Sequence, residues 1–231
     1  MVYRRICFIN IVIFALMVRK MLFTSALLAL FSGAAARDID SLFLEVPEQV
    51  MPLLEHGSRL DMLDLYNCGM EALVINDMGG EARLLKKDSV SFLASTTDVS
   101  RVELRQLSYK KDTIYSCVRT VDLPEPYSQI TFLDKSWKLV PVQLPQKVHL
   151  ADCWFPSDSL SEARIEELRL LLSPVLFSLH WESGTDGFPV LIYEVSVNHL
   201  LPEDQRDAKK CLRPKRYYWN EGKFLTELIK K

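Results

Sequence analysis

The chain has 231 residues, of which 48% are hydrophobic and 25% are charged, with 8 glycines and 11 prolines. This composition is typical of a globular protein and excludes a disordered, collagen-like or low-complexity chain. The length suits one large domain or two small ones, with enough apolar residues to bury a core.

The first 36 residues have the layout of an export signal, with four basic and no acidic side chains. Their two apolar runs, 6–18 and 21–31, are each shorter than the roughly 20 residues that span a bilayer. The second run follows a basic pair and ends in small residues. We predict a signal peptide over 1–36, translated from Met17 and cleaved after Ala36. A membrane hairpin or an uncleaved anchor is the weaker alternative.

Removal of this segment changes the charge of the chain. Residues 37–231 carry a net charge of −6, because four of the 28 basic residues and none of the 30 acidic residues precede residue 37. Residues 37–81 carry ten acidic and two basic side chains, whereas residues 205–231 carry nine basic and three acidic. These regions either lie on separate faces or pair with each other. A nucleic-acid interface requires a basic stripe on a basic domain, so the net charge argues against one.

The first part of the exported chain reads as helical with breaks, over residues 40–66. We place Pro47 and Pro52 at or near helix starts, because proline lacks the amide proton that a helix interior requires. Ser58 is predicted to cap a second helix, which ends at residues 67–69.

Strands are predicted after a turn at residues 76–80. Apolar and polar residues alternate over 90–94 and 102–106, as in strands with one buried face, and a further strand covers 113–121. Residues 130–133 and 137–140 flank a polar turn and read as a hairpin.

The strongest helical pattern lies over residues 159–172. Ser159 and Glu162 have the spacing of a capping box, and Pro174 ends the helix. The rest of the chain is predicted to form two strands, a helix and a final hairpin, over residues 175–181, 190–197, 204–212 and 216–225.

These elements predict an α+β fold, in which an antiparallel sheet carries helices packed on it. The two halves have a similar order of helix, strands, a Leu-Pro-Glu break and a hairpin that contains a tryptophan. One interpretation is a duplication within a single domain over 37–231, with repeats 40–146 and 157–231. Chance similarity between the halves of an α+β chain is favoured equally.

The sequence contains none of the motifs of serine hydrolases, zinc proteases, P-loop proteins or Rossmann proteins. The candidate nucleophile is Cys153, because His149 lies four residues before it. A structural cysteine in a loop is the favoured alternative. Export permits disulfides, and buried free thiols are the other interpretation of the cysteines after residue 36: Cys68, Cys117, Cys153 and Cys211. Their wide spacing argues against a zinc site.

Aromatic residues in the predicted strands and turns are candidates for a binding surface: Trp137, Trp181, Tyr217, Tyr218 and Trp219. Strand side chains alternate, so the three consecutive aromatics at 217–219 do not all face one core. Exposed aromatic side chains are enriched at binding sites. A sheet that is covered on both faces is the competing interpretation.

Several short segments carry a resemblance to a known family: residues 59–66, 69–72, 78–80 and 130–137. On these residues the chain resembles a family of exported proteins of unknown function from gut-type Bacteroidetes. The resemblance implies a location in the periplasm or at the surface of a Gram-negative cell. It implies no catalytic residues.

In that setting, Asp followed by Ser or Thr and an aliphatic residue resembles a bacterial O-glycosylation sequon. The pattern occurs at residues 88–90 and 112–114, and again at 40–42 and 158–160, where helix starts explain it. Ser89 and Thr113 are therefore the candidate glycosylation sites.

Together these observations predict an exported, non-enzymatic binding or accessory module of the cell envelope. The partner would be an envelope protein or a glycan, with no cofactor, no metal, no nucleic acid and no stable membrane span in the mature chain. The alternatives are an envelope hydrolase that uses Cys153 and His149, and a purely structural envelope component.

Overall fold

The structure is a computed structural model that describes residues 37–122, 125–145, 148–184 and 187–226. The predicted signal peptide over 1–36 lies outside the described residues. Residues 36–231 form one compact unit, which contains every element described below.

Two helices open this unit, α2 (Ile39–Glu45) and α3 (His56–Asn67). The side chain of Asp38 caps α2 by accepting the amide of Ser41 at 3.1 Å. The N-cap of α3 is Glu55, so the predicted cap at Ser58 is wrong by three positions.

Neither proline of this region begins a helix, which corrects the prediction for Pro47 and Pro52. Both lie in the segment between α2 and α3. The carbonyl of Pro47 accepts the amides of Val50 and Met51 at 2.9 and 3.1 Å, so the proline starts a tight turn. A proline supports a turn of this kind because its φ is fixed.

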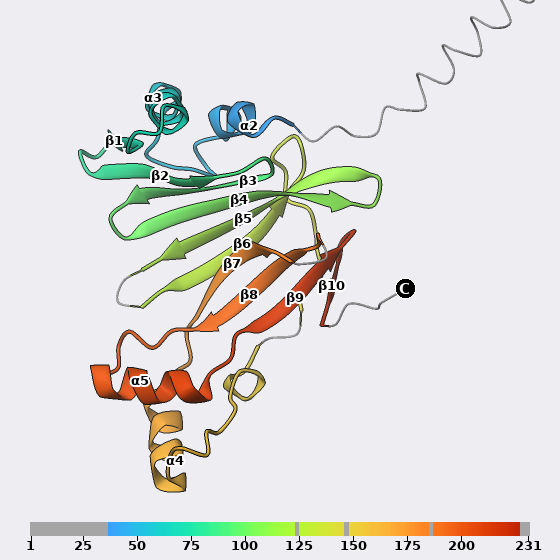
Figure 1. Ribbon diagram of the computed structural model, residues 1–231. Coiled ribbons are helices and arrows are strands. Elements are labelled where there is room, and N and C mark those ends of the chain that lie inside the picture. The colour runs from blue at the N-terminus through green and yellow to red at the C-terminus, as the bar shows by residue number, and fades with distance from the viewer. Residues whose placement is uncertain (1–36, 123–124, 146–147, 185–186, 227–231) are drawn as a thin grey trace, which may run out of the picture. The chain divides into compact units, whose positions relative to one another are not determined.

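Six antiparallel strands follow in an unbroken up-and-down order (Figure 1). They are β1 (Leu73–Ile75), β2 (Glu81–Lys87), β3 (Ser91–Thr97), β4 (Ser100–Tyr109), β5 (Asp112–Val121) and β6 (Tyr127–Leu133). A bulge between Leu84 and Lys86 shifts the register of β2 against β3. The turn after β6 is present as predicted, but its second arm is reduced to a bridge between Leu133 and Leu139.

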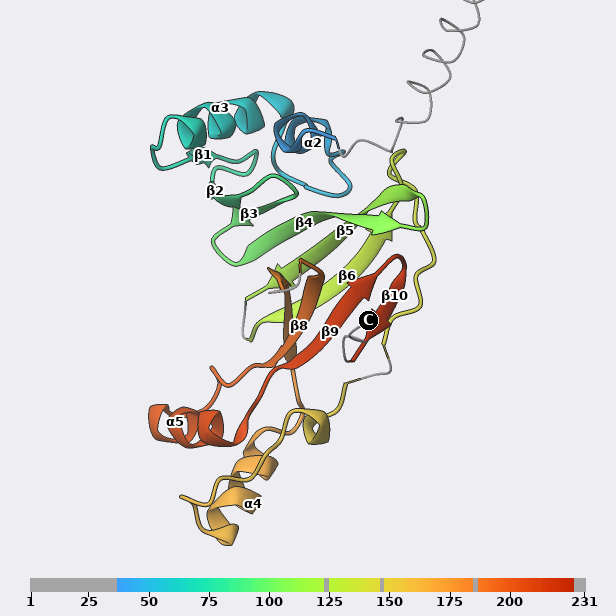
Figure 2. The same ribbon diagram turned by 45° about the vertical axis from the view of Figure 1, so that its right-hand side comes forward.

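One face of this sheet packs against α2 and α3 (Figures 1 and 2). Alternate residues of β3 and β4, among them Phe92 and Leu104, point into a buried cluster with Phe43 of α2. The rings of Phe43 and Phe92 meet edge to face, with centroids 4.8 Å apart. The buried Arg59 of α3 donates to the carbonyls of Phe43 and Val46, which ties the end of α2 to α3.

The second sheet has four antiparallel strands in the order β10-β9-β8-β7. They are β7 (Phe177–Ser183), β8 (Pro189–Val195), β9 (Lys215–Asn220) and β10 (Lys223–Leu225), and helix α5 (Pro202–Cys211) joins β8 to β9. The predicted strands, helix and hairpin of this region agree with these bounds to within three residues.

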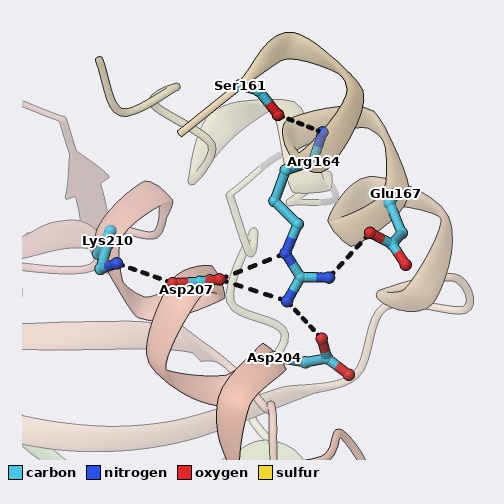
Figure 3. Close-up of polar contacts among 6 residues, drawn as sticks. All are labelled: Ser161, Arg164, Glu167, Asp204, Asp207 and Lys210. Carbon is cyan, nitrogen blue, oxygen red and sulfur yellow. Dashed lines mark hydrogen bonds and ion pairs between the residues drawn. The ribbon is translucent and has the colours of Figure 1, made fainter. Parts of the chain in front are cut away.

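Helix α4 (Glu162–Leu171) precedes the second sheet and packs against α5 (Figure 3). Its N-cap is Ser161, whose hydroxyl accepts the amide of Arg164, so the predicted capping box at Ser159 and Glu162 is wrong by two positions. Arg164 spans the two helices by pairing with Asp204 and, at 3.3 Å, with Asp207, both on α5. These ion pairs fix α4 beside α5.

The two sheets meet on the face of the first sheet that points away from α2 and α3. Residues of β4–β6, such as Leu107 and Phe132, share a buried cluster with Trp181 and Trp219 of the second sheet. The turn before β10 also approaches the first sheet closely. A Cβ atom at Gly222 would lie 2.6 Å from the ring of Tyr109, so this position requires glycine.

The α+β class predicted from the sequence is confirmed by two antiparallel sheets with packed helices. The internal duplication stays a prediction. The first half ends in one continuous meander of strands, whereas the second half has a helix between its second and third strands.

Candidate functional site

The aromatic residues predicted to bind a ligand lie mainly in the hydrophobic clusters. Trp181, Tyr217 and Trp219 are 4%, 7% and 1% exposed, which contradicts an exposed binding role for these three side chains. Trp137 packs against the cluster under α2 and α3. Tyr218 lies half-buried between its two buried neighbours in β9, as strand alternation predicts. Tyr217, Trp219 and, through the strand register, Trp181 lie on one face of the second sheet, so their burial shows that this face is covered.

Two of these tryptophans connect the sheets through their indole nitrogens. Trp181 Nε1 donates to Ser116 Oγ of β5 at 2.8 Å, and Trp219 Nε1 donates to the carbonyl of Ser108 at 2.7 Å. The ring of Trp219 also stacks on Phe132 with centroids 5.5 Å apart. Their role in the fold is to hold the second sheet on the first.

The candidate pair Cys153 and His149 does not have the geometry of an activated nucleophile. Cys153 is fully buried, and burial raises the pKa of its thiol. A nucleophilic cysteine needs the opposite, an accessible thiol with a lowered pKa. The side chain of His149 is exposed, and the residue precedes the short helix η1 (Leu150–Asp152). Its backbone carbonyl accepts the Asp152 amide at 3.0 Å, and its own amide donates to the Asp152 carboxylate at 2.8 Å. Within the described residues, no hydrogen bond joins the two side chains.

All four candidate disulfide cysteines are free thiols in the structure. Cys68 is exposed, and the others are buried. Cys153 and Cys211 lie on two segments joined by the bridge between Trp154 and Leu212, one residue before each bridge partner. Such diagonal positions are about 7–8 Å apart, which exceeds the usual reach of a disulfide. The geometry favours buried free thiols.

The two candidate glycosylation sites lie at strand turns. Ser89 is exposed in the turn between β2 and β3, where the carboxylate of Asp88 accepts the amides of Val90 and Ser91. Thr113 is half-buried near the start of β5, beside Asp112. Glycosylation at either residue stays a prediction.

A polar cavity of about 300 Å³ lies where strand β7 crosses the first sheet. Its floor consists of the first sheet, on the face that points away from the helices. The polar floor residues are Lys86, Ser91, Arg101, Glu103 and Thr120. The wall comes from the second sheet, through Ser178 and His180 of β7 and Glu194 of β8.

The register of the strands explains why these side chains converge. Lys86 pairs with Leu93, and Leu93 pairs with Glu103, so the three lie in one row across β2–β4. Arg101 lies two residues before Glu103 on the same strand and therefore on the same face. The bulge in β2 brings Lys86 to this face.

Strand β7 is held over the cavity by side chains that cap its edge amides. Both carboxyl oxygens of Glu103 accept the amide of Trp181, at 3.1 and 3.2 Å. Ser128 Oγ of β6 accepts the amide of Leu179 at 2.9 Å. An edge strand normally leaves such donors unpaired, so these contacts dock the second sheet without a continuous strand ladder.

Glu103 is the titratable centre of the cavity. Burial raises the pKa of its carboxyl to about 7, although the amide of Trp181 and the cations Arg105, Lys86 and Arg101 act in the opposite direction. At neutral pH the carboxyl therefore exchanges between its protonated and ionised forms. The charge of the cavity changes with it.

Three polar groups of the cavity lack a partner within the described chain. No hydrogen bond or ion pair among the described residues involves the Lys86 ammonium, the Ser178 hydroxyl or the Glu194 carboxylate. Arg101 differs, because it pairs with Asp122 at 3.1 Å. The three groups are available to a ligand.

Sequence reasoning missed this site because charged residues between apolar ones in a strand read as solvent-facing. The available signal was the alternation Arg101, Glu103, Arg105 on one face of β4. Among the described residues, no group of three or more His, Cys, Asp and Glu side chains is placed to hold a metal ion. None of the described helices combines the length and apolar character needed to cross a membrane.

Residues 31–224 match a family described as proteins of unknown function, DUF3256. The chain belongs to this family. The DUF3256 match extends over both sheets, and it confirms the expectation of a family without a known function. None of the curated proteins matches the chain.

A solved structure is similar to this DUF3256 chain: a domain of an uncharacterised protein from Porphyromonas gingivalis W83. The two share 22% sequence identity with a TM-score of 0.61, over 81% of this chain and 98% of that one. At this identity the similarity shows a common fold alone.

Proposed function

We propose that this DUF3256 protein is an exported, non-enzymatic binding module of a Gram-negative cell envelope, whose ligand enters the cavity between the sheets. The observation that carries the proposal is the cavity itself. Lys86, Ser178 and Glu194 present unpartnered polar groups around a titratable carboxyl. A few convergent polar groups in a concave site are the usual basis for a ligand-site hypothesis.

Two observations support a binding role over a catalytic one. The thiol of Cys153 is buried with a raised pKa, and no hydrogen bond among the described residues joins it to the exposed His149 side chain. The layout of the first 36 residues supports export.

Export is tested by expressing the full chain in a Gram-negative host and measuring the mass of the periplasmic protein. We expect a new N-terminus at Arg37. Ala36→Leu should block processing, because signal peptidase requires a small residue at that position, whereas Ser32→Ala should be processed normally. Retention of residues 1–36 by the unaltered protein in the periplasm would contradict the proposal.

Binding is tested by cross-linking residues 37–231 to native envelope material and identifying the captured molecules by mass spectrometry. Ser178→Trp should fill the cavity and abolish specific capture. Ser136→Trp, on an exposed turn, is the matched control. Capture that Ser178→Trp leaves unchanged would exclude the cavity as the binding site.

A further inference from the structure

We propose that the ligand of this cavity is a small carboxylate that also carries hydroxyl groups, of the size of a single sugar acid. The inference rests on the proposed function, because it assigns the ligand chemistry of the same cavity. It follows from the charges, the unpartnered groups and the volume of the site.

The carboxylate is assigned from the cations on the floor. Lys86 has no ion-pair partner within the described chain, and Arg101 reaches the same cavity. Glu103 lies between these cations in the strand register and is only partly ionised near neutral pH. Arg101 is neutralised by Asp122 at 3.1 Å, so the uncompensated positive charge of the floor is that of Lys86. A ligand carboxylate placed there would gain charge-assisted hydrogen bonds, which are stronger than neutral ones.

The hydroxyl groups are assigned from the opposite wall. Ser178 and Glu194 are neighbours across β7 and β8, and neither side chain has a partner within the described residues. A carboxylate accepts hydrogen bonds, and a hydroxyl both donates and accepts. Ligand hydroxyls satisfy both groups.

The volume of the cavity accommodates one small unit. About 300 Å³ corresponds to about ten water molecules at about 30 Å³ each. A sugar acid with about a dozen non-hydrogen atoms fills such a space. The large aromatic rings nearby are enclosed by protein, with Phe92 and Trp181 at 1% and 4% exposure, so neither ring offers its face to a ligand.

Protonation of Glu103 is coupled to such a ligand. A second carboxylate beside Glu103 favours its protonated form, so binding should take up protons. The cations that act on Glu103 are Lys86, Arg101 and Arg105, and Asp88 acts on Arg105 in turn. His180 and Glu194 are the other titratable groups that line the cavity. The dissociation constant should be several-fold lower at pH 6 than at pH 8.5.

The test is an NMR titration of 15N-labelled residues 37–231 with D-glucuronate, D-glucose, acetate and L-threonine. D-Glucuronate should shift the amides of residues 101–103 and 178–181 with a dissociation constant at least about ten-fold below those of the other three. Lys86→Met should weaken D-glucuronate binding about ten-fold. Lys111→Met, on the exposed turn between β4 and β5, should leave it unchanged.

Equal affinity for D-glucose or for acetate would overturn the ligand class and leave the cavity as a binding site. Preference for L-threonine would also overturn it, in favour of a zwitterion. If none of the four probes shifts these amides but the captured envelope material does, this inference fails and the proposed function stands. If that material also leaves them unshifted, both fail.

Two further variants test whether ligand binding is coupled to protonation of Glu103. Glu103→Gln retains an acceptor for the Trp181 amide and should remove most of the pH dependence of D-glucuronate binding. Imidazoles also titrate near neutral pH, so His180→Gln measures the contribution of that ring. A pH dependence that persists in Glu103→Gln and disappears in His180→Gln would overturn the role of Glu103.

Discussion

The two faces of the six-stranded sheet are made by the same strands but have opposite character. On β4, Val102 and Leu104 point into the dry cluster under α2 and α3, whereas Glu103 and Arg105 point toward the second sheet. One face is closed by helices and contributes stability. The other is only partly closed, because β7 docks through capped amides. Polar chemistry therefore concentrates where one sheet covers the other incompletely.

The largest effect that separates the two faces is expected from adjacent residues of β3. Phe92→Ala removes a ring that is 1% exposed and should lower the free energy of unfolding by about 3–5 kcal/mol. Leu93→Ala, on the cavity side, should cost about 1 kcal/mol, because Leu93 is half-buried. Urea denaturation measures both. Equal losses would show that the cavity face is packed as tightly as the helix face.

The cavity face should also make stability depend on pH. Because the pKa of Glu103 is about 7 in the fold and about 4.5 when unfolded, its contribution is fully present below pH 4.5 and is lost as pH rises through 7. Glu103→Gln should therefore be more stable than the unaltered protein at pH 8, by up to about 3 kcal/mol. The difference should vanish near pH 4.

Denaturation curves at pH 4, 6 and 8 check this expectation. Glu48→Gln, at an exposed position between α2 and α3, is the control and should show no such trend. A Glu103→Gln protein that is less stable at pH 8 would mean that the Trp181 amide and the neighbouring cations outweigh burial.

The hydrogen bonds that join the sheets should have a smaller effect. Trp181→Phe leaves the fully buried Ser116 hydroxyl without its indole partner and should cost about 1–2 kcal/mol. Trp154→Phe is the matched control, because its buried Nε1 has no hydrogen-bond partner within the described chain. Thermal unfolding distinguishes them. If Trp154→Phe loses more stability than Trp181→Phe, Trp181 stabilises the fold by packing alone and not through its hydrogen bond.

The smallest expected effect concerns thiol access and leaves stability unchanged. Cys117 lies on the helix-covered face of β5, where burial raises the pKa of its thiol, whereas Cys68 is exposed. A thiol reagent at pH 8 should label Cys68 within minutes and Cys117 only after unfolding. Mass spectrometry of digested protein follows both. Early labelling of Cys117 would show that the helices open readily from the sheet.

The local pattern of apolar and polar residues was sufficient to predict much of the secondary structure. The final hairpin over 216–225 agrees closely with β9 and β10, because a polar turn separates two short aromatic and apolar runs. The cap at Ser58 was misplaced because α3 begins after Glu55 without a side-chain cap. The cap at Ser159 was misplaced because Ser161, two residues later, is the residue that caps α4. Strand β2 was not predicted, because the bulge at Leu84 and Lys86 breaks the alternation. Strand β1 was not predicted, because its three residues are too few to show a period.

The site required information that no local pattern contains. Alternation shows that Glu103 and Leu104 face opposite sides of β4, but it does not show that β7, about 80 residues later, covers Glu103. The lack of long-range information in a local pattern also explains why the aromatic residues were predicted to form a binding surface. Three in a row on β9 indicate two surfaces, and only the docking of the sheets shows that Trp219 fills an interface rather than a binding site.

The capped edge of β7 has a consequence for how the chain assembles. The amides of Leu179 and Trp181 find their acceptors on β6 and β4, which precede β7 in the chain. During synthesis from the N-terminus, the first sheet can therefore form from local hairpins before the second exists. It then serves as the template that closes the β7 edge as that strand emerges. The amides of the β7 edge therefore have acceptors as soon as the strand is made. They are not left unpaired, as an exposed edge that another chain could pair with would be.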